Sequence, residues 1–149
     1  MRYLMLAAML IATPAAARDK ADVLMPSDPQ ALAFQTQFGY AEAVRAGDTL
    51  YLSGVVAAPA PGEKGLVPAY ERAFAHIESI LKRAGASWDD VVDITTYHMS
   101  IDAELGDLST VKNRHVKAPF PTWTAIQVSR LYEPSAVTEI KVTAYKPKR

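Results

Sequence analysis

The chain has 149 residues, half of them hydrophobic, which is enough for one domain with a sizeable core and too few for two. Sixteen Lys and Arg residues balance sixteen Asp and Glu residues, so no strong field would recruit nucleic acid or an acidic membrane surface. The lack of cysteine excludes disulfides, thiolate nucleophiles, iron–sulfur clusters and thiolate zinc sites.

The first 17 residues have the pattern of a secretory signal peptide. Arg2 is a positive start, residues 3–12 are apolar, and Ala15-Ala16-Ala17 is a small-x-small cleavage pattern. The rival interpretation is a membrane anchor, but a spanning helix needs about 20 apolar residues and this run is about half as long. We expect cleavage after Ala17 and a periplasmic or secreted product.

The first elements of the domain are predicted to be strands. We assign residues 18–33 to an extended lead-in and 34–149 to a single domain. Alternating apolar and polar residues over 34–44 are typical of a half-buried strand. Ala46-Gly47-Asp48 predicts a turn, and a second strand over 49–53 makes a hairpin that ends at Gly54. Three prolines and two glycines over 58–68 then predict a surface loop.

Helices and strands alternate in the rest of the chain. Apolar residues at helical spacing predict a helix over 69–84 that ends at Gly85. Ser87 with Asp90 resembles a helix start and leads into a strand over 91–101. Leu105, Leu108 and Val111 indicate a second helix, which ends near Ala118 because prolines follow at 119 and 121. Strands over 122–129 and 137–145 are expected to close the chain as a hairpin.

This order of elements predicts the class α+β, with a mixed sheet and two helices packed on one face. A sheet covered on one face leaves the other needing cover, and a domain of this size is too small to supply it. We therefore expect self-association.

Few residues stand out as candidates for chemistry. His76, His98 and His115 lack the close spacing of a metal site, and Ser53 lacks the context of a nucleophile elbow. Gly54, at a strand end, either lets a ligand approach the main chain or is a simple bulge glycine. Glu139, in an apolar strand, is either a partly desolvated proton carrier or a solvent-facing residue. Trp123 is either core or a cleft wall.

Several short stretches carry a resemblance through their order and spacing. They are Gly39-Tyr40, residues 47–54, residues 81–87, Val91-Val92, Phe120-Pro121, residues 128–131 and residues 137–144. Together they resemble the Rid family of reactive-intermediate deaminases, also called YjgF-like proteins, over about residues 39–144.

The resemblance implies a chorismate-mutase-like fold and a homotrimer in which three sheets form an inner barrel, with ligand clefts between subunits. It implies hydrolysis of 2-imino acids or enamines to 2-oxo acids and ammonia, without metal or organic cofactor. Tyr40, Gly54 and Glu139 match cleft positions of the family, with Glu139 positioning water, and Asn113 lies near the family's cleft Asn, with Lys112 competing for that alignment.

One position departs from the family's pattern. Where the family has Pro-Ala-Arg-Ser, the chain has Pro121-Thr122-Trp123-Thr124. Trp123 therefore occupies the position of the arginine that binds the substrate carboxylate in the family. An indole cannot replace a charged, two-pronged guanidinium, and the affinity for small imino acids should fall at least about tenfold. Lys112, Arg114 or Arg45 could restore the charge from elsewhere in the chain.

Three functions follow, and the sequence leaves open whether the protein is an enzyme. The first is a divergent deaminase or hydrolase acting on an imine-like substrate that stacks on Trp123. The second is a periplasmic binding or protective protein that has lost turnover. The third, a ribonuclease or translation inhibitor, ranks last because the chain lacks a basic patch and paired catalytic histidines. No partner besides a small molecule and further copies of the chain is expected.

Overall fold

A computed structural model describes residues 19–147, and the predicted signal peptide lies outside them. Its strands are β1 (Val23–Leu24), β2 (Ala43–Ala46), β3 (Thr49–Leu52), β4 (Val55–Ala57), β5 (Val91–His98), β6 (Thr122–Gln127) and β7 (Thr138–Tyr145). Its helices are α1 (Pro29–Phe38), α2 (Val67–Arg83) and α3 (Ile101–His115), with 3-10 turns η1 (Lys20–Asp22) and η2 (Trp88–Asp90). In this part of the chain, no helix is both long enough and apolar enough to span a membrane.

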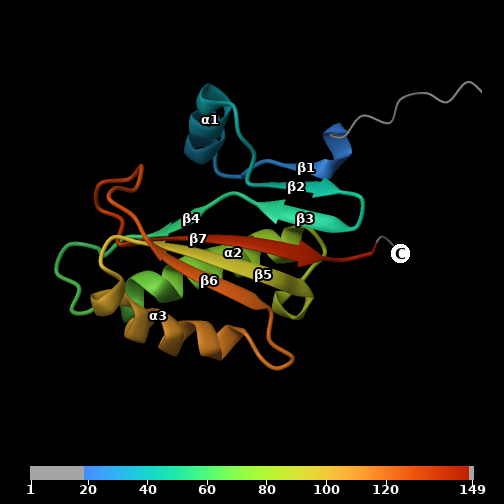
Figure 1. The fold of residues 1–149 in the computed structure, drawn as a ribbon. Coiled ribbons are helices and arrows are strands. Elements are labelled where there is room, and N and C mark those ends of the chain that lie inside the picture. Colours follow the sequence, from blue (N-terminus) through green and yellow to red (C-terminus); the bar gives the residue numbers. More distant parts are fainter. Residues whose placement is uncertain (1–18, 148–149) are drawn as a thin grey trace, which may run out of the picture.

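All seven strands form one mixed sheet in the order β1-β2-β3-β7-β5-β6, with β4 also paired to β7 (Figure 1). The β2–β3 hairpin is confirmed, whereas the predicted closing hairpin of β6 and β7 is wrong. β6 pairs in parallel with β5, and β7 lies on the other side of β5. The segment 128–137 is long enough to carry the chain past β5, which places the apolar strand β7 inside the sheet instead of at its edge.

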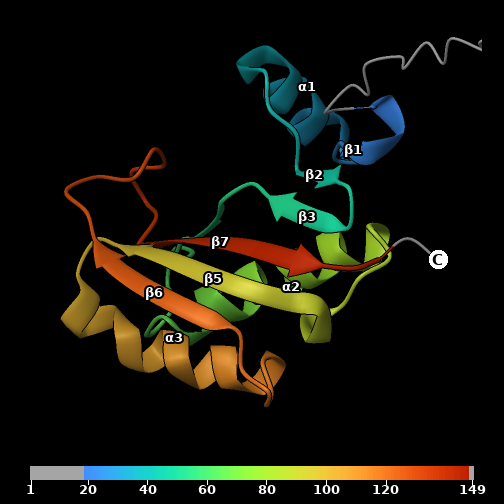
Figure 2. The same cartoon turned by 45° about the vertical axis from the view of Figure 1, so that its right-hand side comes forward.

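The predicted helix layer is confirmed, since α2 and α3 cover one face of the sheet (Figures 1 and 2). On α2 the buried residues recur every three or four positions: Ala69, Tyr70, Ala73, Phe74, Ile77, Ile80 and Leu81. They pack with buried strand residues such as Leu50, Ile94 and Ile140 in a single core. Each large apolar side chain buried in this way contributes about 1.5–3 kcal/mol before chain entropy is counted.

The strand predicted over 34–44 is wrong except at its end, because residues 34–38 belong to α1 and strand β2 begins only at Ala43. Asp28 caps this helix, because its Oδ1 accepts a hydrogen bond from the Ala31 N–H at 2.8 Å. Pro29 takes the first turn, and Gly39 ends the helix with a left-handed φ of 70°. These start and stop signals outweigh the short alternating pattern. The expected boundary at residue 34 falls inside α1, and the lead-in also holds η1 and β1.

The sheet face opposite α2 and α3 is open in the single chain. Along β7 the buried residues Thr138, Ile140, Val142 and Ala144 alternate with the more exposed Glu139, Lys141, Thr143 and Tyr145. Register places Tyr51 and Ile126 on the same open face, where they are 49% and 43% exposed. An apolar open face of this kind is what self-association would cover.

A buried polar network lies beneath the helices. The Glu104 carboxylate accepts hydrogen bonds from the Ser100 N–H at 2.7 Å and the Thr138 hydroxyl at 3.0 Å, and it contacts His98 Nδ1 at 2.9 Å. Tyr70 joins through Thr138 at 2.8 Å, and its burial raises the pKa of the Tyr70 phenol to about 12. His98 is therefore a buried, hydrogen-bonded residue and lines no cavity described here.

We predict that Glu104→Ala lowers the free energy of unfolding by about 3 kcal/mol, because the buried His98 and Thr138 side chains and the Ser100 N–H lose the carboxylate that they contact. Urea unfolding followed by circular dichroism measures this loss. Glu78→Ala is the control, since Glu78 pairs with Lys82 on the surface of α2 and should change stability little. Equal effects of the two substitutions would show that the network does not stabilise the core.

Candidate functional site

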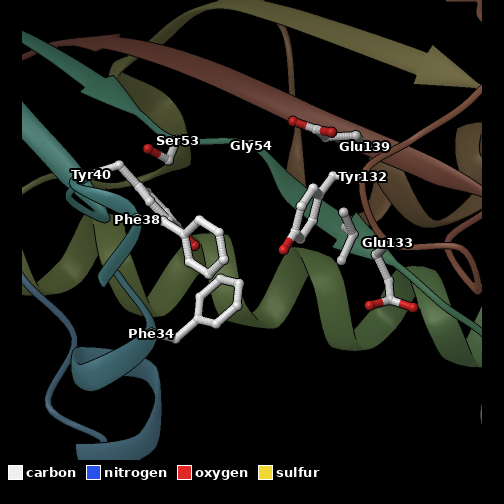
Figure 3. A pocket seen from close by; sticks show the side chains of 9 residues that line it. Phe34, Phe38, Tyr40, Ser53, Gly54, Tyr132, Glu133 and Glu139 are labelled. Carbon is white, nitrogen blue, oxygen red and sulfur yellow. The ribbon is translucent and has the colours of Figure 1, made fainter. Parts of the chain in front are cut away.

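The larger of two cavities of interest lies where α1, the β3–β4 junction, β7 and the 128–137 segment meet (Figure 3). Its volume is about 500 Å³, within the range of about 300–1,000 Å³ that is usual for small-molecule sites. Its lining residues are Phe34, Phe38, Tyr40, Ser53, Gly54, Val56, Tyr132, Glu133 and Glu139. Three residues predicted for the site, Tyr40, Gly54 and Glu139, are therefore brought together.

Gly54 makes room for the Glu139 side chain. Tyr51 pairs with Thr143, and Val55 pairs with Ile140. The chain from β3 to β4 has three residues between these two pairs and β7 has two, so one residue is extra, as in a β-bulge. A Cβ atom on Gly54 would lie 1.8 Å from Glu139 Oε1. Only glycine lets the carboxylate lie over the main chain at this point.

The Glu139 carboxylate is free to act on a ligand or on water. Within residues 19–147 no group makes a hydrogen bond or ion pair with it. Lys141, its neighbour on the same face of β7, donates instead to the Leu52 carbonyl at 3.3 Å. Because Glu139 is only partly exposed and lines the cavity, the structure favours a site residue over a purely solvent-facing one.

Aromatic side chains form the rest of the cavity wall. Tyr40 is partly desolvated, and this burial, followed by the nearby Tyr132 and Glu42, raises the pKa of its phenol. Three of these aromatic residues, Phe34, Phe38 and Tyr132, were not predicted from the sequence. The spacing of Phe34 and Phe38 is the i, i+4 spacing of neighbours on one helix face, and it was hidden by the prediction of a strand there.

A second cavity, of about 310 Å³, contains the other predicted site residues. Asn113 and Lys112 reach it from α3, and Trp123 reaches it from β6. Trp123 is 36% exposed and lines this cavity, which favours a cleft wall over the core. Its only hydrogen-bond donor, Nε1, is engaged with Thr96 Oγ1 at 3.1 Å. The indole therefore presents its ring, and not its N–H, to a ligand.

Of the three cations considered, only Lys112 lies beside Trp123. Its Nζ lies 4.5 Å from the centre of the indole ring and 3.0 Å from Asn113 Oδ1, and burial lowers the pKa of its ammonium group. Arg45 instead donates to the main-chain carbonyls of Ala84 and Lys146, each at 2.8 Å. Arg114 pairs with Glu71. Of Lys112, Arg45 and Arg114, Lys112 is therefore the one whose charge lies at the second cavity.

Within one chain the two groups of residues do not meet. Trp123 is in register with Ile94, on the face covered by helices, whereas Glu139 is in register with Tyr97 on the open face. β5 separates their strands. Among residues 19–147, no three His, Asp or Glu side chains are grouped so as to hold a metal ion.

A family model described as Endoribonuclease L-PSP matches residues 30–146. The chain belongs to this Rid, or YjgF-like, family. The RutC family protein YjgH of Escherichia coli is 35% identical over 113 residues, which cover 74% of this chain and 85% of that protein. A solved structure of YJGH has a TM-score of 0.74 at 29% identity, covering 90% of this chain and all of the other.

A second solved structure supports the Rid fold more distantly. Rv2704 of Mycobacterium tuberculosis, described as a YjgF/YER057c/UK114 family member, has a TM-score of 0.70 at 24% identity. It matches 83% of this chain and 97% of its own. The Rid-type arrangement of sheet and helices predicted from the sequence is thereby confirmed, with α1 as an additional helix.

We predict that Gly54→Ala moves the Glu139 carboxylate by at least about 1 Å, because real contacts to a Cβ atom are almost never shorter than 3.0 Å. A crystal structure of the variant measures the shift. The control is Gly106→Ala on α3, where an added Cβ meets nothing within 4 Å. An unmoved Glu139 in Gly54→Ala would refute the proposed need for glycine.

Proposed function

We propose that this Rid protein is an exported homotrimer that binds a small metabolite in clefts between its subunits. The nearest named chemistry is hydrolysis of an imine or enamine to a 2-oxo acid and ammonia. The observation that carries the proposal is the unpaired Glu139 carboxylate, held over Gly54 in a cavity beside Tyr40.

A carboxylate in this position suits the addition of water to an imine. Glu139 would accept a proton from water as the oxygen bonds to the imine carbon and the C=N bond becomes a single bond. The same carboxyl group would return this proton to nitrogen and then carry the hydroxyl proton to nitrogen as well. The C–N bond would break as the C=O bond forms, and ammonia would leave. The reaction consumes one water molecule and needs no oxidant or reductant.

The two separate groups of site residues support a cleft built by two subunits. Tyr40, Gly54 and Glu139 line one cavity, while Lys112, Asn113 and Trp123 line the other. A neighbouring copy that set its edge strand β6 against the open sheet face would bring one group opposite the other. Lys112 beside Trp123 then gives the ligand's carboxylate a single charge in place of a two-pronged guanidinium.

Trp123 favours a second candidate, a non-catalytic binding or protective protein that uses the same cleft. With its N–H engaged by Thr96, the indole adds ring surface and no grip on a carboxylate. Ribonuclease activity ranks below both, because the described residues lining the larger cavity include two carboxylates and no Lys, Arg or His, which is unfavourable for a phosphate backbone.

The first test is ammonia release from 2-iminobutanoate and 2-iminopropanoate generated in situ. We expect slow release by the natural protein, loss of at least about a hundredfold in Glu139→Ala, and faster release in Trp123→Arg, since a guanidinium restores the carboxylate grip. If the natural protein releases no ammonia and Trp123→Arg does, the result would favour the non-catalytic binding protein. Silence of every variant would rule out imine hydrolysis.

The assembly is tested by light scattering coupled to gel filtration. We expect about three times the monomer mass, because the open sheet face exposes large apolar side chains such as Tyr51 and Ile126. Tyr51→Lys should weaken the assembly, whereas Leu32→Lys on the outside of α1 should not. A stable monomer would remove the intersubunit cleft from the proposal.

A further inference from the structure

Four aromatic side chains that contact one another line the larger cavity, and we call this cluster the aromatic box: Phe34, Phe38, Tyr40 and Tyr132. Phe34 and Phe38 come from α1, and Tyr132 faces them from the 128–137 segment (Figure 3). Ring centroids lie 6.4 Å apart for Phe34 and Tyr132 and 6.1 Å apart for Phe38 and Tyr132. These separations, with interplanar angles of 60° and 70°, are those of rings in tilted and edge contact, so Tyr132 packs against the two rings of α1.

The aromatic box is poorly covered by the chain itself. Phe34 and Tyr40 are 41% and 40% exposed, Phe38 is 53% exposed and Tyr132 is 69% exposed. Large aromatic side chains are usually much more buried, and an exposed cluster of them indicates a binding surface. The Phe34 and Tyr40 rings meet edge to face at 6.4 Å and 89°, an arrangement in which aromatic rings attract each other.

The charge of the cavity is negative. Glu139 lines the cavity and has no hydrogen-bond or ion-pair partner among residues 19–147. Glu133 also lines it, and hydrogen bonds from the Ser135 N–H and hydroxyl lower the pKa of the Glu133 carboxyl group. No Lys, Arg or His is among the described residues that line the cavity. The nearest basic side chain on the same face of β7, Lys141, is bound to a main-chain carbonyl.

These features select the occupant by its charge. A purely apolar occupant would desolvate the Glu139 carboxylate and leave it unpaired, which is costly. An anion would be repelled by the same carboxylate and by the negative faces of the rings. A cation with an apolar substituent suits both the carboxylate and the rings. Its charge would pair with the carboxylate and interact with the ring faces, and its substituent would cover aromatic surface.

We propose that the aromatic box and Glu139 bind an organic cation, a protonated amine or iminium whose nitrogen carries or adjoins an apolar or aromatic group. This inference deepens the proposed function and rests on its assignment of the larger cavity as the ligand site. It specifies that the substrate enters as its protonated form and bears a larger apolar substituent than the shortest imino acids.

The test uses benzyltrimethylammonium, a permanent cation that is not an imine, and measures binding by isothermal titration calorimetry. Benzyl alcohol and benzoate are the neutral and anionic comparisons with the same ring. We expect the cation to bind at least about tenfold more tightly than either comparison, and Glu139→Gln to weaken it at least about fivefold. Equal binding of all three compounds would overturn the proposal, since an apolar pocket would then suffice.

Matched variants distinguish a cation–ring interaction from an effect of side-chain shape alone. Tyr132→Leu and Phe38→Leu should each weaken cation binding about threefold to tenfold, whereas Tyr132→Phe, which keeps the ring, should change it less than about twofold. Both positions are exposed, so folding should be preserved. Leu32→Ala is the control on α1, because Leu32 is 41% exposed and does not line the cavity. Loss of binding in Tyr132→Phe equal to that in Tyr132→Leu would contradict a cation–ring interaction.

The ammonia assay is run on the same variants, so the two proposals fail separately. Cation binding without any ammonia release keeps the organic-cation site and removes the hydrolase. Ammonia release without cation binding keeps the hydrolase and removes the organic-cation site. If the cation does not bind and Phe38→Leu changes the mass in light scattering, a second copy of the chain covers the aromatic box and the proposal is wrong.

Discussion

The position of β7 between β3, β4 and β5 is the constraint on which the rest of this structure depends. Strand alternation turns Thr138, Ile140, Val142 and Ala144 toward the helices and leaves Glu139 on the opposite face. β4 can pair with the same strand only after the chain passes Gly54, where an added Cβ would strike Glu139. The core and the carboxylate of the candidate site are thus set by one pairing.

The buried polar network connects the core to the second group of site residues. Thr96 contacts His98 Nε2 at 2.9 Å and accepts the Trp123 indole N–H, and His98 in turn contacts Glu104. A network in which each partner is paired holds its members in one arrangement. Trp123 is therefore oriented from inside the protein, with its ring and Lys112 left to line the cavity.

The two cavities differ in charge in a way that fits a zwitterionic or cationic ligand better than an anion. One is lined by aromatic rings and carboxylates, and the other holds Lys112 beside Trp123. A Rid protein with arginine in place of Trp123 would hold a carboxylate by two parallel hydrogen bonds. In the proposed function, ring surface takes the place of much of that charge, which would shift selection toward the apolar part and the cationic nitrogen of a ligand.

The sequence by itself determined the elements with strong periodicity and the family. The amphipathic pattern of α2, the turn at Gly47 and the prolines after α3 are local signals, so they survive folding unchanged. The order and spacing of short stretches, including Gly54 and Glu139, identified the Rid family. The predicted replacement of an arginine by Trp123 also rests on the sequence alone, because it is a change of residue type within a recognisable pattern.

Only the tertiary structure decided which residues share a site. The insertion of β7 beside β5 depends on long-range pairing, which no short pattern encodes. α1 was hidden because ten residues with few charges fit either period, and capping by Asp28 and Gly39 settled the outcome. Tyr132 lies about a hundred residues after Phe34 and Phe38 in the chain, and it meets them only because folding brings α1 to the 128–137 segment.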